Sequence, residues 1–322
     1  MKLRRLGSGI ISIALLLLFG FAVLKWQSIS DWWRLRGYIP PEVVAQLATS
    51  TTMLDSSRNL FYVNRPVLAN KQSFNEYCRN NERTIVLGCY IQQDGIYLLD
   101  VTDDRLKGVE EVTAAHELLH AAYDRLSTKE REKVDRMTGS AYQAMGDERI
   151  KSTIELYRSQ DPSIVPNELH SILGTEVRNL SLELEDYYRQ YFADRLQVVG
   201  FSEQYEQAFT ERRNQIIAFD SQLATLKQQI DSLKLSLEQT DSELRSQRSK
   251  MNSLRSSGQT EAYNAEVPSY NSKVNRYNRD IDTLSGLVLK YNEVVQKRNA
   301  IASEEAELVE AIDSREVVPD QR

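Results

Sequence analysis

Helix-breaking residues are scarce in this chain, and positive charge does not dominate it. The 322 residues include 13 glycines and 7 prolines, while charged residues make up 27%. Because glycine and proline interrupt helices, their scarcity indicates a largely helical protein. The net charge is −6, so the chain lacks the basic character of nucleic-acid-binding proteins. We therefore expect no nucleic acid among its partners.

Cysteine and histidine are scarce as well. The two cysteines, Cys78 and Cys89, form no C-x-x-C pair, which argues against a thiol-based metal or redox site. Outside the cytoplasm they can form one disulfide, whereas inside it they would stay two reduced thiols, and we expect the disulfide. Of the three histidines, His116 and His120 stand four positions apart.

These two histidines belong to the segment 113–122, which reads TAAHELLHAA. Side chains four apart lie on one face of a helix, so His116 and His120 can bind one metal ion together. Glu117 projects beside them, where it can take a proton from water. The flanking alanines favour a slim helix that can be buried. An ordinary buried helix with two histidines is the alternative, and we expect the metal site.

The motif His-Glu-Leu-Leu-His in this setting resembles that of the zincin metallopeptidases, over about residues 84–180. The resemblance implies Zn²⁺ as the cofactor, a protein or peptide as the substrate, and Glu117 as the catalytic base. It also implies a β-hairpin before the motif helix and a third metal ligand from a later helix. Two histidines and a carboxylate suit zinc best, although iron(II) uses similar ligands.

Independently of this resemblance, the residues before the motif predict a β-hairpin. Segments 84–91 and 96–101 are rich in β-branched and aromatic residues, and they flank Asp94-Gly95, a strong turn signal. By analogy with the zincins, one strand of this hairpin would pair with an extended peptide substrate.

The third ligand is sought in the segment that follows Pro166. Residues 167–171 read Asn-Glu-Leu-His-Ser and look like the third-ligand helix of the gluzincin branch, which implies that Glu168 binds the metal. In that branch the small residue three positions later lets helices pack closely. The acid that the branch carries four positions after the ligand is absent, because Ile172 stands there. The alternative ligands are Glu176 and His170.

The beginning of the chain reads as a membrane anchor. Basic residues precede an uncharged apolar run, Leu6 to Leu24, which is long enough to span a bilayer. Three tryptophans follow that suit the membrane interface, Trp26, Trp32 and Trp33. No convincing small-x-small site ends the run, so we expect an uncleaved signal-anchor rather than a cleaved signal peptide. The rest of the chain would then lie outside the cytoplasm.

Residues 203–312 carry apolar side chains in steps of three and four, the pattern of a coiled coil. The first series runs from Ile216 to Leu254 and the second from Val267 to Val295. Gly258 and Pro268 favour a fold-back between them, so we expect an antiparallel hairpin rather than a parallel dimer. Such a hairpin can serve as a spacer or can bind a protein partner.

The expected architecture is α+β and mainly helical, with a small sheet. It comprises an anchor with its juxtamembrane segment (1–40), a zincin-like metallopeptidase domain (41–202), a coiled-coil hairpin (203–312) and a disordered tail (313–322). The elements expected within the metallopeptidase domain, besides the hairpin strands, are helices over 41–52, 109–126, 127–145, 148–158, from Pro166 onward and over 180–196, and a strand at Asn59–Val63.

We therefore expect a single-pass membrane metallopeptidase that acts outside the cytoplasm, with His116, His120 and Glu168 as metal ligands. A phenol near the site can donate to an oxyanion, but such aromatic clusters more often pack a core; the candidates are Tyr157, Tyr187, Tyr188 and Tyr191. The alternative function is a non-enzymatic envelope scaffold that acts through the coiled-coil hairpin, with an inactive zincin-like domain.

Overall fold

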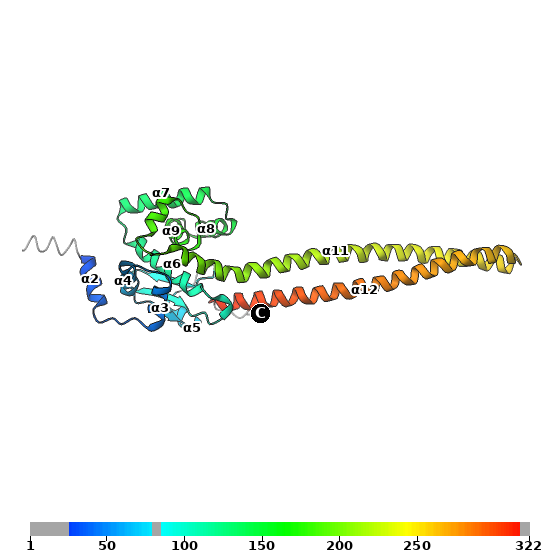
Figure 1. The fold of residues 1–322 in the computed structure, drawn as a ribbon, viewed down its shortest axis with the longest axis horizontal. Helices are drawn as coiled ribbons and strands as arrows, with labels where there is room; N and C mark the ends of the chain where they lie inside the picture. The colour runs from blue at the N-terminus through cyan, green and yellow to red at the C-terminus, as the bar shows by residue number, and fades with distance from the viewer. Residues whose placement is uncertain (1–25, 79–84, 316–322) are drawn as a thin grey trace, which may run out of the picture. The chain divides into compact units, whose positions relative to one another are not determined.

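The computed structural model describes residues 26–78 and 85–315 (Figure 1). The expected anchor at Leu6 to Leu24 and most of the expected tail lie outside the described residues. Within the described part, no helix combines the length and the apolar composition that a bilayer span requires. The chain divides into two compact units. The first comprises residues up to Ala208 and from Val309 onward, and the second is Phe209–Leu308.

The first unit contains a small sheet among helices. Its strands are β1 (Val67–Ala69), β2 (Gly88–Ile91) and β3 (Gly95–Leu99), in the order β1-β3-β2. β2 pairs antiparallel with β3, with Cys89 opposite Tyr97, while β1 pairs parallel with β3. The hairpin is therefore confirmed, in shortened form, and β2 lies at one edge of the sheet. A disulfide joins Cys78 to Cys89, as expected.

The remainder of this unit is mainly helical: besides a 3-10 turn at Asp104–Leu106 and the beginning of α11 (Arg195–Ser256), it contains several complete α-helices. They are α2 (Trp26–Leu35), α3 (Glu42–Ser50), α4 (Asp55–Val63), α5 (Lys71–Tyr77), α6 (Val109–Asp124), α7 (Thr128–Ala144), α8 (Glu148–Gln160), α9 (Val165–Glu176) and α10 (Leu182–Tyr188). The helices expected at 41–52, 109–126, 127–145 and 148–158 are confirmed, with ends shifted by at most two residues. The capping box that begins α7 is present, with Ser127 and Glu130 bonded to each other's backbone.

Two sequence predictions in this unit are wrong. The segment Asn59–Val63 is not a strand but the second half of α4, and the third strand is β1 instead. Ser57 and Phe61, four positions apart, are both buried, so a helical face rather than a strand face packs inward. The helix expected over 180–196 is interrupted after α10, because the backbone around Tyr191 pairs with residues 52–54 instead.

The motif helix α6 lies in the core of the first unit. Its buried side chains include Ala114, Ala115, Leu118 and Leu119, each fully shielded from solvent. These residues belong to one apolar cluster with side chains from α3, α4, β3, α9 and α10. Because the small alanines let neighbouring elements approach α6 closely, the helix is held on several sides and its remaining face is fixed toward a cleft.

The second unit consists of two paired helical arms, parts of α11 (Arg195–Ser256) and α12 (Thr260–Ile312) (Figure 1). Ion pairs run antiparallel along it: Arg212–Glu304 at 3.2 Å, Asp220–Arg298 at 3.1 Å, Glu243–Lys273 at 3.1 Å and Lys250–Glu266 at 2.5 Å. The buried residues of the first arm are separated by three, four or seven positions, as the coiled-coil pattern predicts, namely Leu226, Ile230, Leu237, Thr240, Leu244 and Met251. The antiparallel hairpin is thus present.

The turn of the helical hairpin lies at Gly258, one of the two residues that favoured a fold-back. Gly258 adopts a left-handed backbone conformation, with φ of 73°, between the two helices. The expectation that Pro268 marks the fold-back is wrong, because this residue lies inside α12. Pro268 is exposed, so its ring projects away from the seam, and because proline has no amide N–H it cannot make the i→i−4 hydrogen bond of α12 at this position.

Candidate metal centre

Helix α6 presents His116 and His120 toward the cleft. Their rings are neighbours, with centroids 4.7 Å apart and planes at 79°. The side chains are 19% and 12% exposed, so both are shielded while their ring edges still line the cleft. The four-residue spacing predicted from the sequence therefore brings the two imidazoles together on one helical face.

Helix α9 brings Glu168 against this pair. Its Oε2 lies 3.6 Å from His116 Nε2, and its Oε1 lies 3.5 Å from His120 Nε2. One ligand atom from each of the three side chains falls within 4.8 Å of the others. Glu168 Oε2 is buried and makes no hydrogen bond among the described residues. A buried carboxylate whose two oxygens each face an imidazole nitrogen fits a tetrahedral cation such as Zn²⁺.

The charge state of Glu168 suits this role. Burial alone would raise the pKa of its carboxyl, but the neighbouring His120 and His116 outweigh that effect and lower the pKa below its ordinary value. The carboxylate therefore stays ionised at neutral pH, which is the form that binds a metal ion.

Neither of the two alternative ligands, Glu176 and His170, belongs to this triad. Glu176 faces the same cleft, but its Oε2 accepts a bond of 2.9 Å from Arg149 Nη1. His170 is fully buried, with Nε2 2.9 Å from the Tyr187 hydroxyl, and its own carbonyl accepts a bond of 2.7 Å from Tyr188. Burial, followed by the charges of His120 and His116, lowers the pKa of His170 to about 3, so it stays neutral.

The aromatic cluster near the end of the first unit packs around His170. Tyr187, Tyr188 and Tyr191 all have ring centroids within 6.1 Å of the His170 ring. None of these three lines the cleft, whereas Tyr157 does. The core-packing interpretation therefore describes the three clustered tyrosines, and Tyr157 is the candidate phenol that faces the cleft.

Ser171 supplies a contact that the sequence interpretation missed. Its Oγ lies 3.2 Å from His120 Nδ1, on the side of the ring opposite the nitrogen that faces Glu168. In the tautomer with Nδ1 protonated, that N–H donates to Ser171 and leaves the Nε2 lone pair for a metal. The sequence signal for this contact is the small residue three positions after Glu168, which the resemblance to gluzincins connects only with helix packing.

Glu117 is 4% exposed and lines the cleft beside the two histidines. The backbone of β2 lies directly against it. A Cβ added at Gly88 would come within 2.6 Å of Thr113 Cγ2 and 2.8 Å of Glu117 Oε1. Gly88 therefore allows the edge strand to approach the carboxylate of Glu117 more closely than any other residue would.

The approach of α9 to α6 depends on a second glycine. A Cβ at Gly174 would lie 2.4 Å from Leu119 Cδ1 and 2.8 Å from Tyr188 Cε1. Both partners are fully buried, so neither has room to move. The glycine therefore sets the separation between the helix that carries the histidines and the helix that carries Glu168.

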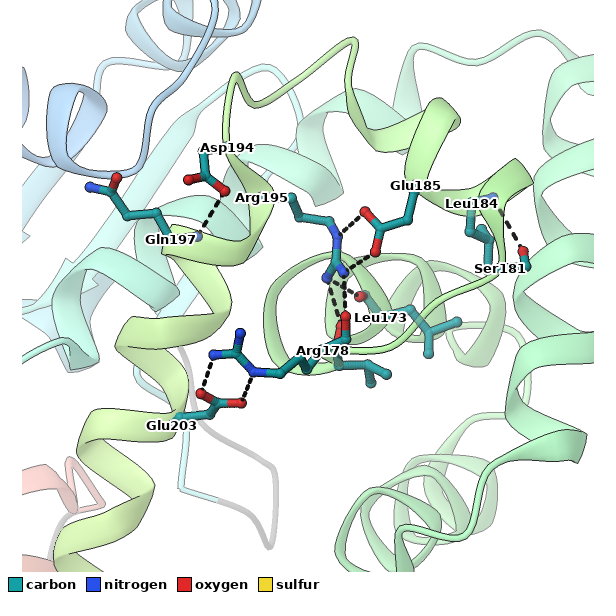
Figure 2. A network of polar contacts seen from close by, with 10 residues as sticks. Leu173, Arg178, Ser181, Leu184, Glu185, Asp194, Arg195, Gln197 and Glu203 are labelled. Carbon is teal, nitrogen blue, oxygen red and sulfur yellow. Dashed lines mark hydrogen bonds and ion pairs between the residues drawn. The ribbon is translucent and has the colours of Figure 1, made fainter.

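A buried arginine at the start of α11 holds the far end of α9. Figure 2 shows Arg195 pointing at the chain that leaves this helix. Its guanidinium donates to the carbonyls of Val177 at 2.7 Å and Arg178 at 3.0 Å, and it pairs with Glu185 through Nε at 3.0 Å. The Arg195 side chain is only 4% exposed. Because α9 ends without a cap of its own, these bonds satisfy carbonyls at its exit.

The cleft itself has a volume of about 540 Å³. Its apolar walls come from the segment entering β2, from α6, α8 and α9, and include Ile85, Leu87, Val112, Ile150, Ile164 and Ile172. The polar residues that line the cleft include the triad and Glu117, and also Arg149, which pairs with Glu176. The cleft is large enough for a few residues of a peptide.

No protein-family model, curated protein or solved structure matches this chain. The functional inference therefore rests on the residues of the cleft.

Proposed function

We propose that the chain is a zinc-dependent metallopeptidase of the zincin type, anchored in a membrane through residues 6–24 and acting outside the cytoplasm. One observation carries the proposal: His116 and His120 from α6 meet Glu168 from α9, with Glu117 beside them in the same cleft. A metal site without hydrolytic function has no need of a fourth, acidic side chain at this point.

The chain's own residues would act as follows. His116, His120 and Glu168 would hold the ion, which when bound supplies Lewis acidity toward water and toward a carbonyl oxygen. Glu117 would take a proton from the attacking water and pass it to the leaving amine nitrogen. Ser171 would keep the ring of His120 in the orientation and tautomer that this arrangement needs.

Substrate binding is proposed along β2. This strand lies at the edge of the sheet and its residues Gly88 to Tyr90 line the cleft. An extended peptide can add to such an edge through main-chain hydrogen bonds, which would place it over Glu117. The disulfide Cys78–Cys89 supports the proposed location, because disulfides persist mainly outside the cytoplasm.

The metal site is tested by elemental analysis of the purified full-length chain in detergent after zinc reconstitution. We expect about one zinc per chain in the wild type, and loss of that zinc in Glu168→Ala. Glu176→Ala is the matched control, because it removes a carboxylate from the same helix and cleft but not from the triad. Absence of zinc from the wild type, or loss in Glu176→Ala alone, would refute this ligand set.

Hydrolysis is tested with Glu117→Gln, which keeps the size of the side chain and removes its basicity. The variant should keep its zinc and lose cleavage of quenched fluorogenic peptides by a factor of about 100 or more. If the wild type binds zinc but cleaves none of a diverse peptide set, or if Glu117→Gln keeps full biological effect, the non-enzymatic scaffold becomes the better account.

A further inference from the structure

Helix α2 has two unlike faces. At about 100° per residue, Trp26, Ile29, Trp32, Trp33 and Arg36 project within one arc of about 120°. Asp31 and Arg34 project on the other side. The helix is thus amphipathic, although it stands apart from the metal centre and plays no part in the proposed chemistry.

The polar face of α2 contacts the rest of the first unit at a defined place. Asp31 accepts two hydrogen bonds from Arg125, at 2.5 and 2.9 Å, and Arg125 directly follows α6. Arg34 donates to the carbonyl of Asp94 in the turn between β2 and β3, at 3.2 Å. Arg65 in turn donates to the carbonyl of Arg34. α2 is therefore held against the end of the motif helix and the tip of the hairpin.

The aromatic face is uncovered. Trp26, Trp32 and Trp33 are 70%, 56% and 61% exposed, and the Arg36 guanidinium lies 5.4 and 5.6 Å from the centroids of the latter two rings. Three indoles on one face form an apolar surface that water does not favour. Indole combines an apolar body with one N–H donor, and arginine pairs with phosphate, so this composition matches the interface of a phospholipid bilayer.

The position of α2 in the chain points to the same occupant. The apolar run Leu6 to Leu24 ends two positions before Trp26, so a chain anchored by that run begins α2 at the bilayer surface. We propose that α2 lies along this surface with its three tryptophans in the interface, and so fixes the first unit against the membrane. The proposal rests on the membrane anchor of the proposed function and adds to it the placement of α2; it depends on neither zinc nor hydrolysis.

The orientation of α2 can be measured directly, because the chain has three tryptophans and all are in α2. Trp26 and Trp33 lie on one face, about 10 Å apart along the axis at 1.5 Å per residue. If α2 lies along the bilayer, both rings share one depth. If α2 points away from the bilayer, Trp33 lies about 10 Å further out than Trp26.

The experiment uses the full chain in phosphatidylcholine vesicles whose acyl chains are brominated close to the headgroup. Two variants are compared: Trp32→Phe/Trp33→Phe, which retains Trp26, and Trp26→Phe/Trp32→Phe, which retains Trp33. We expect both to lose most of their emission to the brominated lipid, and to emit at shorter wavelength than tryptophan in water. The matched control is the same variant in vesicles without bromine.

Two outcomes would overturn the proposal. Trp33 quenched by aqueous acrylamide but not by the brominated lipid would show that α2 stands away from the bilayer. Trp33 quenched by neither would show that another copy of the chain covers this face. Peptide cleavage by the same samples reports on the proposed function separately, since no tryptophan lines the cleft, and its failure leaves the lipid quenching unaffected.

Discussion

Replacing Gly174 by alanine tests whether α9 and α6 approach as closely as described. The added methyl would lie 2.4 Å from Leu119 Cδ1 and 2.8 Å from Tyr188 Cε1, both in fully buried side chains. Tyr188 is further held by its hydrogen bond to the carbonyl of His170. The methyl can therefore be accommodated only if α9 moves away from α6, and Glu168 would move with it.

The size of the effect follows from two opposing contributions. Alanine favours a helix over glycine by about 1 kcal/mol, whereas overpacking a tight core costs about 1 to 3 kcal/mol. With two contacts below 3.0 Å against immobile partners, we expect the upper end of that cost. Gly174→Ala should thus destabilise the first unit by about 2 kcal/mol and weaken zinc binding at the same time.

Gly139→Ala is the matched control, since Gly139 also lies within a helix, α7, but its added Cβ would meet nothing within 4 Å. This variant should gain about 1 kcal/mol, so the two substitutions should differ by about 3 kcal/mol, or about 100-fold in the opening equilibrium. Hydrogen exchange of α6 and α9 amides measures this in the first unit alone. Equal stability of the two variants would refute the close approach.

Three further substitutions test other contacts. Ser171→Ala should lower zinc affinity about 10- to 100-fold in competition with a chromophoric chelator, with little change in stability; unchanged affinity would contradict its role on His120. Arg195→Leu leaves the Glu185 carboxylate unpaired and should cost about 3 to 5 kcal/mol, visible as faster hydrogen exchange at the end of α9. Wild-type protection there would refute the capping role. Removing the disulfide, whose cysteines lie 11 positions apart, should lower the free energy of unfolding in urea by about 3 kcal/mol. An unchanged urea midpoint would contradict a stabilising role of this disulfide.

The parts of the site that were predicted depend on spacing within one element. His116 and His120 need only a helix to meet, and the alanines around them indicate that the helix is buried. Glu168 was expected only through the resemblance to gluzincins. The sequence alone does not show how the helix that carries Glu168 packs against the helix that carries the histidines. The bond from Ser171 to His120 depends on the relative rotation of α6 and α9, which no single segment encodes.

The failures share a physical origin. The segment Asn59–Val63 has the β-branched and aromatic content of a strand, yet the burial of Ser57 and Phe61 favours a helix at that place. Similarly, the interruption after α10 depends on bonds of 3.0 Å from the Leu54 amide to the Tyr191 carbonyl and 2.8 Å from the Ala193 amide to the Thr52 carbonyl. These partners are more than a hundred positions apart, so local pattern gives no sign of them.

The chain leaves the first unit after Ala208 to form the hairpin and re-enters the same unit at Val309. Beyond the second arm, the chain returns to the first unit, where the Ser314 hydroxyl donates to the Val86 carbonyl and Asn75 donates to the Ser314 carbonyl. Residues 209–308 are therefore an insertion within a continuous domain. Matched heptads can be deleted from or added to both arms while the entry and exit points stay in place. The length of the hairpin can thus change without any change to the residues of the cleft.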